Sequence, residues 1–97
     1  FDKNLTRVYE YGIEKFGYLQ AERYNDKIRR ALSTLSTFHS MYPECRHLAT
    51  KSRMYRNIIL DAHLIIYRIT DARIEVLDII HSASSIRKIR GVRNIRL

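Results

Sequence analysis

The residues of this sequence that could act on a phosphodiester are a histidine that ends an apolar run and several arginines. His81 closes the stretch IEVLDIIH and precedes the arginine-rich stretch SASSIRKIR. Cleavage of RNA through its 2′-hydroxyl needs a general base, a general acid and cations that stabilise the pentavalent phosphate. The candidates are His81 or a tyrosine for proton transfer and, as cations, Lys51, Arg53, Arg56 and Arg68. Every tyrosine lies at or before Tyr67, so the basic stretch has no second proton-transfer residue beside it.

Two other interpretations of these residues compete with catalysis. His81 is also explained as a strand-end residue that hydrogen-bonds to the adjoining backbone, because one histidine that titrates near neutrality does not define an active site. The arginines are also explained as a surface that binds a polyanion or an acidic protein without cutting it. We favour binding over catalysis, because binding needs only the charges that the sequence supplies.

Positive charge is concentrated in two regions of the chain. The net charge is +8 and the isoelectric point is about 10.0. Residues 82–97 contain five lysines and arginines and no acid, and residues 46–56 contain four and no acid. Such regional charge raises the prior for nucleic acid, an acidic protein or an anionic surface as partner. The predicted partner-binding residues are Arg53, Arg56, Arg87, Lys88 and Arg90.

Composition limits the remaining classes of site. The 97 residues are expected to form a single domain, residues 1–97. Cys45 is the only cysteine, which excludes an internal disulfide and a cysteine-based metal cage and favours a reducing cytoplasm. No carboxylate stands at ligand spacing from the histidines, so we expect neither a metal nor a cofactor. No apolar run has the length of a membrane-spanning helix.

The elements that would position these residues follow from the hydrophobic periods. Apolar residues at steps of three and four predict a helix over residues 2–16 and a second one over 21–38, joined at Gly17 as a helical hairpin. Phe16 and Phe38 are expected to be core residues at the helix ends. Residues 39–52 are predicted to be a connection, and 53–60, 63–69 and 74–81 a three-stranded antiparallel meander. A short third helix is expected within residues 84–97, with fraying beyond Gly91.

The predicted sheet leaves apolar surface to be covered. Its last strand has apolar residues on both faces, and one helical hairpin covers only one face. An acidic amphipathic peptide that binds in a groove or adds a strand would cover the rest. The three-stranded sheet is also thin for two long helices, and the chain begins at Phe1 without a methionine. We therefore expect a further strand before Phe1.

The order of these elements resembles the RelE/ParE superfamily of bacterial type II toxins over residues 4–90. The resemblance rests on Phe16-Gly17, on the Gln-Ala-x-x-Tyr opening of the second helix, on Arg53, on Tyr67-Arg68 and on Val76-Leu77-x-Ile79-x-His81. It implies an α+β fold, a leading strand and a cognate antitoxin with an acidic, amphipathic segment. Members of the superfamily have two activities: ParE-like toxins poison DNA gyrase, and RelE-like toxins cut messenger RNA on the ribosome.

The chain is more similar to the ParE branch, because the hairpin is long and a basic helix follows His81. The resemblance therefore implies a non-enzymatic gyrase inhibitor that contacts DNA only through the antitoxin complex. The alternative is a ribosome-dependent endoribonuclease that uses His81 with Arg53, Arg56 and Arg68. One departure concerns residues 82–85: ParE-like chains often carry an Arg-x-Asp-type patch here, and this chain has Ser-Ala-Ser-Ser.

Overall fold

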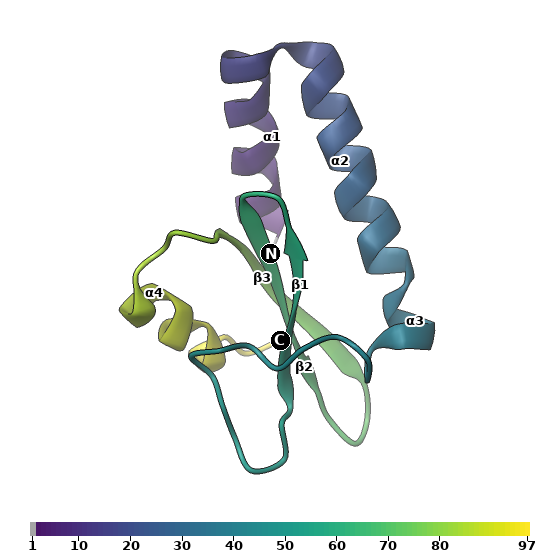
Figure 1. The fold of residues 1–97 in the computed structure, drawn as a ribbon, viewed down its shortest axis with the longest axis vertical. Coiled ribbons are helices and arrows are strands. Elements are labelled where there is room, and N and C mark those ends of the chain that lie inside the picture. The colour runs from purple at the N-terminus through teal and green to yellow at the C-terminus, as the bar shows by residue number, and fades with distance from the viewer. Residues whose placement is uncertain (1) are drawn as a thin grey trace.

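A computed structural model describes residues 2–97, with the backbone alone at Asp2. Figure 1 shows two long helices standing on a small sheet, with the C-terminal segment at its side. The elements in chain order are α1 (Asp2–Phe16), α2 (Tyr18–Ser33), α3 (Leu35–Phe38), β1 (Tyr55–Leu60), β2 (His63–Ile69), β3 (Ile74–His81), α4 (Ile86–Gly91) and the 3₁₀-helix η1 (Val92–Asn94). This order confirms the predicted α+β fold.

Helices α1 and α2 form the predicted antiparallel hairpin. Gly17 is the only residue between them and has a φ of 86°, a left-handed conformation that glycine adopts without strain. The two helices approach each other closely at Gly12, where an added Cβ would lie 3.3 Å from the Cβ of Ala21. The second helix is shorter than predicted. It is interrupted at Thr34, whose hydroxyl is 2.6 Å from the Ala31 carbonyl oxygen and 2.5 Å from the hydroxyl of Tyr42.

The sheet is the predicted meander, with strand order β1-β2-β3 and antiparallel pairing throughout. Strand β1 begins two residues later than expected, and Arg53 before it has a φ of 56° that interrupts the extended chain. The pairing of β2 with β3 shifts by one between Ile66 and Tyr67, which leaves Leu77 without a partner. The connection seals the outer edge of β1: Asn57 N–H donates to Pro43 (3.1 Å) and Cys45 N–H donates to the Tyr55 carbonyl (2.9 Å).

The sheet lies between two hydrophobic clusters. The helical hairpin covers one face through Ile28, Leu35, Ile58, Leu60, Ile65, Tyr67 and Ile79. The opposite face packs against the connection and the C-terminal segment through Cys45, Leu48, Tyr55, Ile66, Leu77, Ile80, Ile89 and Val92. The apolar surface beyond the reach of the hairpin is therefore covered in large part by the chain itself.

The segment beyond Gly91 is ordered, so the expected fraying was wrong. Val92 is only 3% exposed, and a salt-bridge network holds the last residues. The Glu75 carboxylate lies 2.6 Å from the Arg68 guanidinium and 2.7 Å from that of Arg73. The same two guanidinium groups donate to the carbonyl oxygens of Ile95 and Leu97, each at 3.3 Å. The carbonyl oxygens of the tail thus accept hydrogen bonds from these arginines, whereas those of a free end would accept them from water.

Two aromatic residues lie outside the core in which they were predicted. Phe16 is 61% exposed and Phe38 is 46% exposed, and each is the last residue of its helix. The predicted leading strand would precede Phe1 and lies outside the described residues. Within residues 2–97, no helix is both long and apolar enough to cross a membrane.

Candidate partner-binding surface and histidine groove

Helix α4 has exposed cations and packs against buried residues of the sheet. Its N-cap is Ser85, whose hydroxyl accepts a hydrogen bond from the Lys88 amide at 3.2 Å. Ile89 is its buried residue and belongs to the cluster on the second face of the sheet. With Ile89 inward, the neighbouring cations Arg87, Lys88 and Arg90 are exposed. We call these three exposed side chains the basic face.

The two predicted contact arginines near β1 differ in how free they are. The Arg53 side chain is 64% exposed and lies 3.8 Å from Glu44, at the distant limit of an ion pair. Arg56 donates instead to the carbonyl oxygens of Ser40 at 2.9 Å and Tyr42 at 2.8 Å. Its guanidinium therefore fixes the connection in place, and Arg53 is the freer of the two cations.

The residues of the alternative nuclease set do not come together. In the sheet register His81 pairs with His63, and Tyr55 pairs with Arg68. His63 and Arg68 are five residues apart on β2, which is about 17 Å at roughly 3.3 Å per residue. Arg68 is also committed to Glu75, with its Nε 2.7 Å from the carboxylate. His81 thus lies at the opposite end of the sheet from the arginine that it would need.

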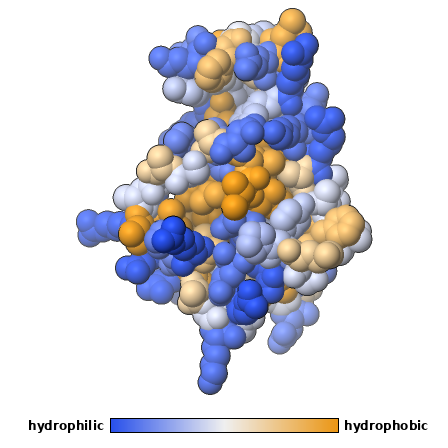
Figure 2. Space-filling view, in the orientation of Figure 1, coloured by the Kyte–Doolittle hydropathy of each residue, from blue (hydrophilic) through white to orange (hydrophobic). Residues whose placement is uncertain are grey.

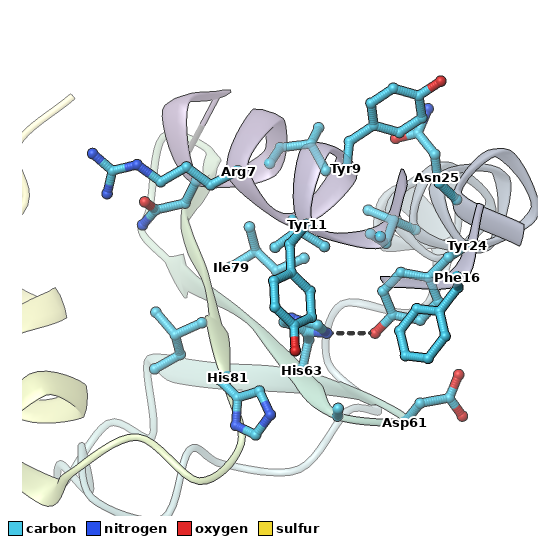
Figure 3. Close-up of a pocket in the computed structure, with 18 of the residues that line it drawn as sticks. Arg7, Tyr9, Tyr11, Phe16, Tyr24, Asn25, Asp61, His63, Ile79 and His81 are labelled. Carbon is cyan, nitrogen blue, oxygen red and sulfur yellow. Dashed lines mark hydrogen bonds between the residues drawn. The ribbon is translucent and has the colours of Figure 1, made fainter. Parts of the chain in front are cut away.

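His81 instead lies at one end of a groove formed by the hairpin, the β1–β2 turn and the end of β3. The groove has a volume of about 610 Å³. In Figure 3 the side chains of Tyr11, Phe16 and Tyr24 come from the helices, and His63 and His81 come from the strands. The walls of the groove are mainly apolar. Its lining also includes Arg7 and Lys88, which add cations at the rim. We call it the histidine groove.

The polar groups of the groove are linked to one another. The Tyr24 hydroxyl lies 2.7 Å from His63 Nδ1 and donates to the Leu60 carbonyl at 3.3 Å. The rings of His63 and His81 meet edge to face, with centroids 5.5 Å apart. His81 Nδ1 accepts a hydrogen bond from the Ala83 amide at 3.0 Å, which places the proton of the neutral ring on Nε2.

The surroundings hold two of these groups in their neutral forms. Burial and, to a smaller extent, the neighbouring His81 lower the pKa of His63, and Asp61 opposes them. Burial, aided by Asp61, raises the pKa of Tyr24 to about 12. At pH 7 neither group supplies a charged acid or a phenolate base. The arrangement is therefore suited to binding an apolar or amphipathic segment, with Arg7 and Lys88 as the cations of its lining.

The sequence identified His81 but not its two partners in the groove. His63 was interpreted only as the first residue of a strand, and Tyr24 as a helix core residue. The position of His63 could have been predicted from the two-residue separator at residues 61 and 62. This separator puts His63 at the end of the sheet where β3 finishes. Among residues 2–97 no three metal-ligating side chains form a group that could hold an ion.

Comparison with known proteins identifies the family. The family model described as "ParE toxin of type II toxin-antitoxin system, parDE" matches residues 1–86. A search of curated proteins found no match. The matched region includes both helices of the hairpin, the whole sheet and the first residue of α4. The chain therefore belongs to the ParE toxin family of type II toxin–antitoxin systems.

Proposed function

We propose that this toxin inhibits DNA gyrase in the cytoplasm and that a cognate antitoxin holds it inactive. The observation that carries the proposal is the basic face of α4, three exposed cations with no acid in residues 82–97. Membership of the ParE toxin family supports gyrase as the target over a ribosomal one. Arg53 is a further predicted contact, on the connection side of the sheet. Arg56 supports this side indirectly, because its guanidinium group holds the connection in place.

The physical role of the basic face is electrostatic. Exposed cations attract an acidic protein surface or a phosphate backbone, and they do so more strongly at low salt. Binding by this face needs no proton transfer, in agreement with the separation of His81 from Arg68 along the sheet. The toxin would then act by forming a complex with its target, with no bond made or broken by its own side chains.

A charge-reversal experiment tests the proposal. The variant Arg87→Glu/Lys88→Glu/Arg90→Glu should lose inhibition of gyrase supercoiling in a plasmid assay. The matched control is Lys15→Glu/Arg23→Glu/Arg29→Glu, which reverses one lysine and two arginines at exposed positions of the hairpin. The control has the same net charge and should inhibit like the wild type. Equal inhibition by both variants, or none by the wild type, would contradict the proposal.

A further inference from the structure

The histidine groove is elongated and has its positive charge at one end. In Figure 3 Arg7 and His81 lie on one side of the groove, and Phe16 lies on the other. Arg7 and Phe16 are nine residues apart on α1, which is about 14 Å at roughly 1.5 Å per residue. Because α4 packs on the other face of the sheet through Ile89, Lys88 meets the groove at the edge strand β3, where His81 completes the lining. The two cations and His81 thus belong to the end of the groove away from Phe16.

The walls between the two ends are apolar and partly open to solvent. They include Tyr11 and Phe16 of α1, which are 57% and 61% exposed, and Tyr24 and Ile28 of α2. Figure 2 shows hydrophobic residues at the surface in several places, including the end of the hairpin farthest from the sheet. The volume of about 610 Å³ lies within the range of small-molecule sites, about 300–1,000 Å³, which combine apolar walls with a few polar groups. The groove therefore has the size and lining of a site for a small amphipathic ligand.

The cations of the groove are available to an anion. In the part of the chain whose side chains are described, neither Arg7 nor Lys88 belongs to an ion pair. Asp61, the acid among the described residues of the lining, is already paired with Lys27 at 2.9 Å. The neutral ring of His81 adds an Nε2–H donor at the same end. A ligand with one anionic group would therefore be oriented with that group at this end.

We propose that the histidine groove binds a medium-chain fatty acid, with its carboxylate at Arg7 and Lys88 and its acyl chain along the apolar walls towards Phe16. An unbranched chain matches a groove with one long axis, and a single carboxylate matches one cationic end. An extended peptide would instead bring backbone N–H and C=O groups that need hydrogen-bond partners along its whole length. The mainly apolar walls do not supply such a row of partners. This ligand follows from the groove alone and does not depend on the target of the toxin.

The test is a titration of the purified toxin at neutral pH with hexanoate, octanoate and decanoate, followed by the shifts of its backbone amide NMR signals. Affinity should rise by about fourfold for each added CH₂ group that becomes buried. The alcohol of the same chain length should bind about fivefold more weakly than each acid, because it lacks the charge that meets the two cations. The shifted amides should belong to α1, α2 and the end of β3.

Two pairs of variants test the two ends of the groove. Arg7→Gln removes a cation that is not part of the basic face, and it should lower affinity for decanoate by at least about twofold without changing affinity for decanol. Its matched control is Arg23→Gln, an exposed arginine of the hairpin outside the groove lining, which should bind both ligands like the wild type. Phe16→Ala should weaken acid and alcohol alike. Phe38→Ala removes an exposed phenylalanine outside the lining and should weaken neither.

Several results would overturn the fatty-acid site. These are the absence of binding by all three acids, equal affinity of the wild type for acid and alcohol, and amide shifts that lie away from the groove. A wild-type dimer that Phe16→Ala dissociates, as measured by sedimentation, would assign the groove to a second copy of the toxin and would also overturn it. Because Arg7 and Phe16 lie outside the basic face, failure of the gyrase proposal would leave these affinities unchanged.

Discussion

The orientation of the basic face depends on one buried side chain, which Ile89→Ala tests. Ile89 is 5% exposed and is the buried residue of α4. The substitution removes three carbons at about 0.8 kcal/mol each and leaves a cavity, a total of about 2–4 kcal/mol. A domain of this size is stable by about 5–15 kcal/mol in all. The expected loss is therefore a large part of the free energy of unfolding. It weakens first the packing of α4 on the sheet.

Ile86→Ala is the matched control, because it makes the same chemical change one turn earlier at a half-exposed position. Both substitutions replace isoleucine by alanine, a better helix former, so their difference reports mainly burial. Urea unfolding should show a difference of at least about 1 kcal/mol between the variants. Hydrogen exchange of the α4 amides should accelerate by about 30-fold or more for Ile89→Ala. Equal stability and exchange in the two variants would refute the described docking of α4.

Three further predictions follow from single contacts. His81→Ala should leave growth inhibition unchanged, as measured by induction in cells; loss of toxicity by a folded variant would favour a nuclease. The pKa of His63 is lowered by burial, so the native state binds fewer protons than the unfolded chain. Its contribution to stability is present above about pH 6.5 and decreases as the pH falls below that value. Urea unfolding at pH 7 and pH 5 should therefore show a larger loss for the wild type than for His63→Gln, and equal losses would contradict this assignment. Glu75→Gln should weaken the grip of Arg68 and Arg73 on the tail and speed tryptic cleavage after Arg93, whereas an unchanged rate would mean that the network does not hold it.

Much of the fold follows from local pattern. The hydrophobic steps of three and four predicted α1 with the bounds that it has, and Gly17 predicted the turn. The second and third strands were also predicted with their observed ends, because short polar separators bounded continuous apolar runs. These features depend on residues close in sequence, where periodicity and turn chemistry act directly.

The remaining features depend on contacts between distant residues. The guanidinium group of Arg56 binds carbonyl oxygens 14 and 16 residues away, and no pattern distinguishes such an anchor from an exposed cation. The tail was expected to fray because its own period weakens, yet arginines of the sheet hold it. The bulge in β3 is equally invisible, since regular pairing from Ile69 and Ile74 would place Ile80, and not His81, opposite His63.

That bulge gives the last strand one residue more than a regular ladder would need. Leu77 and Ile80 are three residues apart and would point to opposite sides of a regular strand, yet both belong to the cluster under α4. The irregular pairing turns the chain between them, while Val76 and Ile79 remain against the hairpin. Removing Leu77 would restore an ideal ladder and leave Ile79 and Ile80 opposite the same partners, Ile65 and Leu64, on the same sides as before. Loss of a residue beyond the bulge, with the bulge kept, would instead move Ile80 to the side of the hairpin, so the cost of losing one codon in this strand depends on which codon is lost.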